Sequence, residues 1–402
     1  MMPLRILTVA GWMHPDAEGG SFRFVYELNR ALALRGHRPT ILTGRVRPDL
    51  PPEEDMDGIR VVRFPVSTSG TAAFYYSTYT GVRRSLAELV DTSEIIHTHH
   101  PVSAFSTAYS IGETTPMVHT LHIVYFLEYL DRVTGGMPIV TGGQKLAAAL
   151  LRRMEAYTLG KCRRTVVLSG AVREQIDEHF PNAALEAVSI PAGVDLEFFS
   201  PAIPRSEARE RLALPTDRPI LLTVRRLEPR MGLDNLIEAM PAIREAFPRC
   251  LLLIGGRGSL DDTLRRQAAE AGLDDAVRFL GYVSEKNLPV YYRAADAFVL
   301  PTRALEGFGM VTLEALACGT PPIVTPVCGA PEAVRPFDPD LVAAGVGPAD
   351  IADAIVRFLN RPDREELAQR CRAYAEHFSW DAIAEQYEQV YDQALEAAGE
   401  AV

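Results

Sequence analysis

The fold is decided by residues 4–43, which read LRILTVAGWMHPDAEGGSFRFVYELNRALALRGHRPTILT. A short apolar run at 4–10 is followed by a glycine-containing loop at 11–20 and an amphipathic segment at 21–35, and a second apolar run begins at Pro39. This order predicts a strand, a loop, a helix and another strand. Because apolar strands that alternate with helices form parallel sheets covered on both faces, the stretch predicts a doubly wound α/β fold.

The same alternation continues through the chain with one interruption. Around residues 190–204 three prolines break the pattern, after which the alternation starts again. The further expected strands are 59–64, 95–98, 117–121 and 165–168 before the interruption, and 220–224, 251–254, 277–280, 297–300 and 322–325 after it. The sequence therefore predicts two consecutive doubly wound units of similar size. A last helical pattern at 379–397 could pack on either unit.

Composition and charge narrow the class of protein. With 402 residues, of which 47% are apolar, the chain can form two or three domains with large cores. The net charge of −11 argues against sequence-independent binding to nucleic acids. No run approaches the ~20 apolar residues needed to span a bilayer. The five cysteines are widely spread and never form a C-x-x-C pair, which indicates a soluble protein of the reducing cytoplasm.

Two glutamates lie in residues 301–315, which read PTRALEGFGMVTLEA. Glu306 and Glu314 are eight residues apart, and on one helix they would be about 80° and ~12 Å apart, too far for a shared acid/base pair. The glycines between them disfavour a helix there, which places Glu306 in a loop and Glu314 about one turn inside the following helix. The N–H groups at the start of that helix would suit a phosphate. The plainer alternative is an ordinary turn whose glycines serve packing only.

Three arginines follow the first strand of the second predicted unit, in residues 225–232, which read RRLEPRMG. Guanidinium groups are permanently charged and bind phosphate with two parallel hydrogen bonds, so Arg225, Arg226 and Arg230 suit a diphosphate. A solvated surface loop is the alternative. These arginines follow the carboxyl end of a strand, at the same edge as Glu306. This position favours a diphosphate-binding loop over a solvated surface loop.

The motifs of the chain resemble those of a known family. They are similar to the retaining, nucleotide-sugar-dependent glycosyltransferases of family 4, which have the GT-B fold, over nearly the whole chain. The motifs are Glu18-Gly19-Gly20, Ile95-Ile96-His97-Thr98-His99, Thr120-Leu121-His122, Ile190-Pro191-Ala192-Gly193-Val194-Asp195, Arg226-Leu227, the element Glu306 to Glu314, and Gly319-Thr320-Pro321. The resemblance implies two Rossmann-like domains across a cleft: 1–197 for the acceptor and 198–378 for the nucleotide sugar. It also implies that the helix within 379–402 crosses back onto the first domain.

The resemblance implies a role for each site residue. Glu306 would hydrogen-bond the donor sugar, Arg226 would neutralise the diphosphate and His122 would contact the transferred sugar, so these three form the catalytic set. Glu314 would bind the ribose. The other donor-binding residues would be Gly19 and Gly20 at the diphosphate, Phe308, Gly309, Met310 and Val311 as backbone donors, Val283 and Ser284 near the base, and Arg225 and Arg230.

One position departs from the family pattern. Met231 stands where the family usually has a lysine that pairs with the diphosphate, and a thioether cannot do this. Either Arg225 or Arg230 takes over the charge, or the leaving group is stabilised less.

Cleavage of a sugar-diphosphate bond leaves negative charge on the phosphate, which fixed cations and amide dipoles can stabilise without a metal. This argument predicts a metal-independent enzyme without a cofactor, and the resemblance implies that it is a retaining hexosyltransferase. It would use a nucleoside diphosphate sugar and a hydroxyl acceptor on a glycan, lipid or small molecule. The nucleobase, the sugar, the acceptor and the oligomeric state depend on contacts that the motifs do not place.

Two other activities compete with this interpretation. A GT-B epimerase or hydrolase would bind the same donor and transfer nothing. A metal-dependent hydrolase is the weaker alternative, because histidines at strand ends can bind zinc but need further ligands from later strands. The histidines concerned are His97, His99, His100, His119 and His122.

A basic helix suggests a third role, at the inner face of a membrane. Apolar residues at 146–151 and 159 are accompanied by Lys145, Arg152, Arg153, Lys161, Arg163 and Arg164. Such a helix can lie on anionic lipid. We favour the alternative that its apolar face packs on the first sheet.

Overall fold

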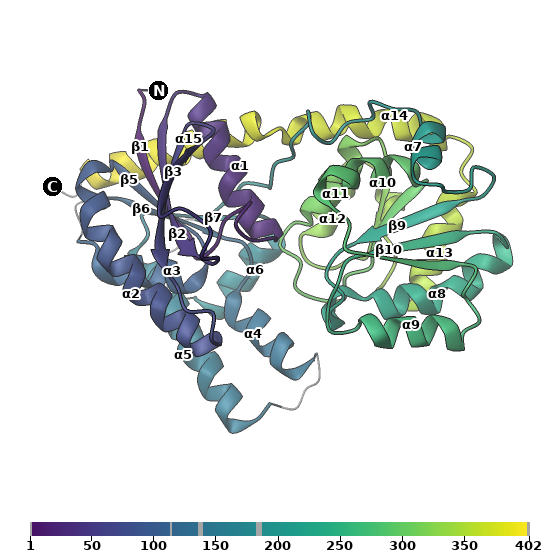
Figure 1. Cartoon of the computed structure of the whole chain (residues 1–402), viewed down its shortest axis with the longest axis horizontal. Coiled ribbons are helices and arrows are strands. Elements are labelled where there is room, and N and C mark those ends of the chain that lie inside the picture. The colour runs from purple at the N-terminus through teal and green to yellow at the C-terminus, as the bar shows by residue number, and fades with distance from the viewer. Residues whose placement is uncertain (1, 113–114, 136–139, 182–186, 400–402) are drawn as a thin grey trace. The chain divides into compact units, whose positions relative to one another are not determined.

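The chain forms two compact units (Figure 1), each built on a mainly parallel sheet, as the alternation in the sequence predicts. The computed structural model describes residues 2–112, 115–135, 140–181 and 187–399. Unit 1 comprises residues 1–133, 139–193 and 380–402, and unit 2 comprises residues 134–138 and 194–379.

The sheet of unit 1 has eight strands in the order β3-β4-β2-β1-β5-β6-β7-β8. Their bounds are β1 Arg5–Val9, β2 Arg38–Arg45, β3 Glu53–Met56, β4 Ile59–Pro65, β5 Ile95–Thr98, β6 Met117–Leu121, β7 Arg164–Val167 and β8 Ala187–Ser189. Only the pair β3 and β4 is antiparallel among these neighbours. The sequence pattern does not predict β3, because this edge strand reads EEDM and no side chain in it is fully buried.

Helices cover both faces of this sheet. Their bounds are α1 Gly20–Leu34, α2 Thr71–Leu89, α3 Pro101–Ser110, α4 Tyr125–Thr134, α5 Gly142–Lys161, α6 Gly170–His179 and α15 Trp380–Gly399. On one face, Leu86 of α2 and Ala108 of α3 pack in one core with Leu7 of β1. On the other face, Val25 of α1 packs with Ile41 of β2.

The last helix, α15, packs within unit 1. The hydroxyl of Tyr391 lies 2.8 Å from Nδ1 of His97, and the hydroxyl of Tyr387 lies 2.9 Å from the Thr120 hydroxyl. Nε of Arg35, the residue that directly follows α1, donates to Glu388 over 2.7 Å. Buried polar contacts therefore join this helix to strands far away in the sequence.

The sheet of unit 2 has five parallel strands in the order β11-β10-β9-β12-β13. The strands are β9 Ile220–Val224, β10 Leu251–Gly255, β11 Val277–Gly281, β12 Ala297–Leu300 and β13 Pro322–Val324. The helices are α7 Arg205–Arg211, α8 Leu233–Ala246, α9 Asp261–Glu270, α10 Leu288–Ala294, α11 Met310–Ala317, α12 Ala330–Val334, α13 Pro348–Leu359 and α14 Arg364–Ala375. The loops after β9 and β12 leave from neighbouring strands, so the two predicted donor-binding loops start side by side.

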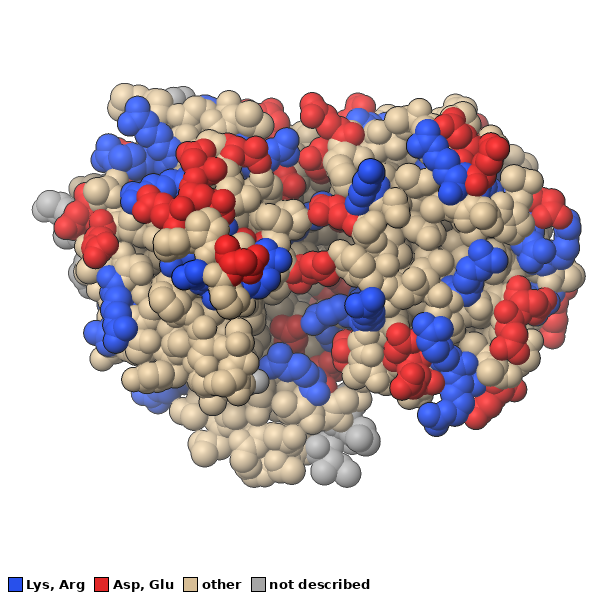
Figure 2. Space-filling model, viewed as in Figure 1, with Lys and Arg blue, Asp and Glu red and all other residues tan. Residues whose placement is uncertain are grey.

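No helix in the described part of the chain is long and apolar enough to cross a bilayer. Figure 2 shows acidic and basic side chains interspersed over the visible face of unit 2.

Candidate active site

The two loops that follow β9 and β12 interlock. Gly232 has φ +71°, and a Cβ at this residue would lie 1.8 Å from the carbonyl oxygen of Pro301. The N–H of Arg303 donates to the carbonyl of Arg230 over 2.9 Å. A side chain at residue 232 would therefore push the arginine loop away from the glutamate loop.

Within these loops, Arg225 binds Glu306. Nη2 of Arg225 lies 2.9 Å from Oε2 of Glu306, and Nη1 donates to the hydroxyl of Thr302 over 2.7 Å. The same hydroxyl lies 3.3 Å from Oε2 of Glu306. Burial lowers the pKa of Arg225, and the Glu306 carboxylate opposes that shift. Arg225 and Thr302 therefore hold the carboxylate in one orientation.

The other two arginines of the loop, Arg226 and Arg230, differ from Arg225 in their exposure and contacts. Nη1 of Arg230 donates to the carbonyl of Leu305 over 2.5 Å. Leu305 has φ +56°, so the residue before Glu306 has a backbone conformation that is rare for a side chain of this kind. The side chain of Arg226 is exposed, whereas Met231 is buried. Of the three arginines, Arg226 has the exposed side chain that could meet a diphosphate.

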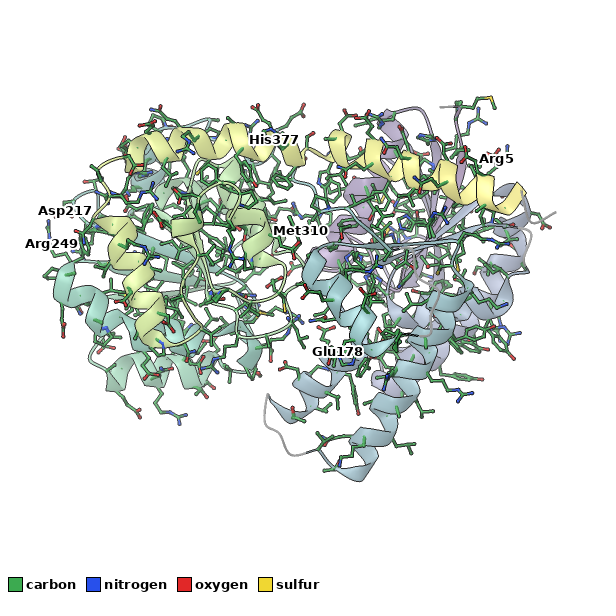
Figure 3. All side chains as sticks on the ribbon, turned by 180° about the vertical axis from the view of Figure 1, so that it is seen from behind. Arg5, Glu178, Asp217, Arg249, Met310 and His377 are labelled. Atoms are coloured by element: carbon green, nitrogen blue, oxygen red, sulfur yellow. The ribbon has the colours of Figure 1, made fainter. Side chains whose placement is uncertain are left out.

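Helix α11 begins directly after this loop. Gly309 precedes it with φ +78°, and no side chain caps the helix start. A Cβ at Gly309 would lie 3.1 Å from Cδ2 of Leu300. The ring of Phe308 is buried, so this residue can offer a ligand only its backbone. The first N–H groups of a helix have no partner within it, which leaves those of Met310 (Figure 3) and Val311 suited to an anion.

Glu314 lies one turn further along α11, as predicted, and is buried. Its Oε2 accepts a hydrogen bond of 2.9 Å from the hydroxyl of Tyr292 in α10. The sequence analysis did not single out Tyr292, because a tyrosine in a helical pattern is indistinguishable from a core residue.

Val283 and Ser284 follow β11 and are half-buried. A Cβ at Gly255 would lie 2.8 Å from Cγ2 of Val283, so the end of β10 and the loop after β11 are in close contact. These residues therefore lie at the same edge of the sheet as the arginine loop.

In unit 1, Gly19 and Gly20 form the start of α1. No side chain caps this helix at Gly19, and a Cβ there would lie 2.9 Å from the ring of Phe22. The loop before them is anchored by a buried ion pair, in which Nε of Arg63 lies 2.6 Å from Oδ2 of Asp16. The glycines therefore lie between an anchored loop and a helix start that no side chain caps.

His122 follows β6 and is held by a second histidine. Its Nε2 lies 3.1 Å from Nδ1 of His99, and its ring meets the edge of Phe24 at 4.9 Å between centroids. Burial lowers the pKa of His122 well below 6.5, and the nearby histidines add to this. His122 is therefore neutral near pH 7, and His99 is a partner that the sequence analysis did not assign to it.

The histidines His97, His100 and His119 make hydrogen bonds within unit 1. His97 uses Nδ1 toward Tyr391 and Nε2 toward Thr120, both at 2.8 Å. Nδ1 of His119 lies 3.0 Å from the carbonyl of Thr98, and Nδ1 of His100 accepts from the N–H of Gly11 over 3.2 Å. Within the described ranges no three His, Cys, Asp or Glu side chains are grouped so that they could hold a metal ion. The metal-dependent hydrolase therefore gains no support.

Two D-x-D sequences, at 55–57 and 338–340, are also engaged within the fold. Asp57 accepts a hydrogen bond from the hydroxyl of Tyr26. Oδ2 of Asp338 lies 2.7 Å from Nη1 of Arg361. Neither pair belongs to the loops that follow β9 and β12.

Two family models match the chain. The model described as Glycosyltransferase Family 4 covers residues 18–198, and the model described as Glycosyl transferases group 1 covers residues 204–378. Gly19, Gly20 and His122 fall in the first match, and the arginine loop with both glutamates falls in the second.

Relatives and solved structures agree with these matches. The D-inositol 3-phosphate glycosyltransferase of Acidothermus cellulolyticus is 31% identical, over 94% of this chain and 86% of the relative. The protein of the same name from Geodermatophilus obscurus is 30% identical, over 98% and 90%. Sucrose-phosphate synthase from Thermosynechococcus elongatus superposes with a TM-score of 0.82 at 27% identity, covering 98% of this chain and 100% of that one. Anabaena Alr3699/HepE, solved with UDP and glucose, has a TM-score of 0.73 at 18% identity, over 97% and 99%, and shows the fold alone.

Proposed function

Since the chain belongs to glycosyltransferase family 4 and has the GT-B fold, we propose that it is a retaining hexosyltransferase that uses a nucleoside diphosphate sugar and a hydroxyl acceptor. The observation that carries this proposal is the hydrogen-bonded set of Arg225, Thr302 and Glu306, formed by loops from two neighbouring strands. A carboxylate held by two side chains, in the loop that precedes an uncapped helix start, suits a sugar joined to a phosphate.

Unit 2 would bind the donor. The carboxylate of Glu306 is oriented to accept hydrogen bonds from sugar hydroxyls, and the amides of Met310 and Val311 would face the phosphate. Arg226 would supply the cation for the diphosphate. Glu314, held by Tyr292, would accept from the ribose hydroxyls.

The chemical step needs no protein base in this arrangement. The bond from the anomeric carbon to the phosphate oxygen breaks, and the acceptor oxygen bonds to that carbon on the same face. The acceptor proton passes to the departing phosphate oxygen. Glu306 is held by an ion pair with Arg225, so its role is to bind the sugar. Fixed cations and amide dipoles would stabilise the leaving diphosphate without a metal or a cofactor.

Unit 1 would bind the acceptor, with the neutral His122 contacting the transferred sugar. The curated relatives are named for D-inositol 3-phosphate, so a phosphorylated polyol belongs among the acceptors to be tested. A lipid-borne acceptor and contact with the inner face of a membrane are also proposed, and the surface that supports them is described below.

Transfer is tested by incubating the chain with UDP-, GDP- and ADP-sugars, with and without a panel of hydroxyl acceptors. We expect release of nucleoside diphosphate that depends on the acceptor, together with a glycosylated product by mass spectrometry. Glu306→Gln should abolish this release, while Glu270→Gln, on the exposed side of α9, should not. Equal release with and without every acceptor would indicate a hydrolase, and conversion of the donor sugar without release would indicate an epimerase.

A further inference from the structure

Five large side chains project into solvent from three helices of unit 1. Leu146 and Leu150 of α5 are 65% and 57% exposed, and Tyr157 of the same helix is 38% exposed. Tyr109 of α3 and Tyr76 of α2 are 56% and 72% exposed. We call these five residues the helix-face patch.

The patch is continuous from α2 to α5. The ring of Tyr157 lies 6.4 Å from that of Tyr109 and 5.6 Å from that of Phe105. Tyr79 of α2 in turn lies 6.4 Å from Tyr109 and 6.2 Å from Phe105. Leu146, Leu150 and Tyr157 are spaced by four and seven residues, so they share one face of α5.

The face of α5 that carries Leu146, Leu150 and Tyr157 is directed away from the sheet. The residues of α5 that pack inward are Ala148, Glu155, Thr158 and Leu159. The expectation that the apolar side of this helix packs on the sheet therefore holds for Leu151 and Leu159 and is wrong for Leu146 and Leu150. Two leucines that point into water on adjacent turns are available to a partner.

The charge around the patch is opposite in sign to that of the whole chain. Helices α2, α3 and α5 carry six basic residues and two acidic ones, in a chain of net charge −11. Glu155 is buried, and its carboxylate accepts from the N–H groups of Tyr125 and Phe126 at 2.7 and 3.0 Å. The basic residues are Arg83, Arg84, Lys145, Arg152, Arg153 and Lys161, all exposed, and the other acidic residue is Glu88. The partner of the patch should therefore be anionic.

We propose that the helix-face patch docks on the surface of an anionic phospholipid bilayer. Leucines on one helix face can enter the acyl boundary, tyrosines prefer the level of the headgroups, and arginine and lysine are attracted by anionic lipid. The guanidinium of Arg83 lies over the rings of Tyr79 and Tyr109, at 5.5 and 5.6 Å, so the basic and aromatic parts of the patch are joined. The inference concerns a partner of unit 1 and does not depend on the proposed donor chemistry.

Sedimentation of the full chain with vesicles tests the proposal. We expect the protein to sediment with vesicles of 30% phosphatidylglycerol in phosphatidylcholine and to remain in solution with phosphatidylcholine alone. The variant Leu146→Ser/Leu150→Ser should bind the anionic vesicles about tenfold more weakly. Arg153→Glu/Lys145→Glu should lower binding further, and added salt should weaken the binding of the wild type.

Matched controls use residues outside the patch. Leu34→Ser removes a leucine that is 78% exposed on α1, and Arg266→Glu reverses an exposed charge on α9. Both should bind vesicles as the wild type does. The melting temperature in buffer without lipid should be equal in all variants, which separates loss of docking from loss of folding.

Three results would overturn the proposal. One is no binding to anionic vesicles, and another is binding that the patch variants do not reduce. The third is a dimer in size-exclusion chromatography that the leucine variant converts to a monomer, since the patch would then belong to a second copy of the chain.

Discussion

Arg225 and Glu306 are 81 residues apart in the sequence, and their side chains meet at 2.9 Å in unit 2. The second terminal nitrogen of the same guanidinium donates to Thr302. Arg225 therefore contacts neighbouring side chains, and in the proposed function its effect on a ligand would pass through the orientation of Glu306. This differs from a role as a simple counterion of the diphosphate.

Replacing Arg225 should separate sugar binding from diphosphate binding. In Arg225→Gln the carboxylate of Glu306 loses its charged partner, so we expect donor turnover to fall about a hundredfold. The dissociation constant of the nucleoside diphosphate without sugar should change less than about threefold. Calorimetry with both ligands gives the comparison, and Arg249→Gln, an exposed arginine of unit 2 (Figure 3), is the matched control. Equal weakening of both ligands would show that Arg225 is a diphosphate cation.

The exposed Arg226 should be the cation that the diphosphate meets. Arg226→Ala should cost ~3 kcal/mol of transition-state stabilisation, about a hundredfold in turnover, and should weaken binding of the free diphosphate as well. Met231→Lys should change turnover by less than about threefold, because the side chain at this position is buried. A marked rise in the turnover of Met231→Lys would show that the site lacks the charge of the family lysine.

Donor turnover should be unchanged when divalent metal ions are removed by a chelator. Because Arg226 and the amides at the start of α11 would carry the charge of the leaving group, EDTA should leave the rate of nucleotide release unchanged. The same assay with added Mn²⁺ should show no stimulation. Loss of activity in EDTA that Mn²⁺ restores would mean that a metal stabilises the diphosphate.

The configuration at the anomeric carbon should be kept. The loop that holds Glu306 leaves its carboxylate paired with Arg225, and attack from the opposite face would need a free carboxylate to accept the acceptor proton. Proton NMR of early product should show the anomeric coupling of the donor. A product with the inverted coupling would rule out same-face transfer.

Glu155 should make stability depend on pH. Burial raises the pKa of this carboxyl from 4.5 to about 7, although two backbone N–H groups favour its charged form. Because the folded state then holds a proton that the unfolded chain releases, the contribution of Glu155 to stability should be greatest below pH 4.5 and should fall, by about 3 kcal/mol, as pH rises to 7.

The variant Glu155→Gln should remove this dependence. Its melting temperature should fall less than that of the wild type between pH 5 and pH 7, as measured by thermal shift. Glu270→Gln, exposed on α9, should follow the wild type. Parallel curves for Glu155→Gln and the wild type would mean that Glu155 stays charged in the fold.

The sequence by itself determined the two doubly wound units, because apolar runs of strand length that alternate with helical patterns have one good way to bury themselves. It also placed Glu306 in a loop and Glu314 inside a helix, since glycine and helix periodicity act locally. The sequence pattern did not predict the charged strand β3, because its pairing with β4 comes from backbone hydrogen bonds and not from an apolar pattern.

Only the tertiary structure decided which side chains meet. The partner of Glu306 depends on two strands that become neighbours in the sheet, and the partner of Glu314 lies in α10, a separate helix. The exposure of Leu146 and Leu150 depends on which side of α5 faces the sheet, and a helix that is apolar on more than one side leaves that choice open. Periodicity fixes the local backbone and its buried faces, whereas side-chain contacts between distant segments are fixed by the packing of the whole unit.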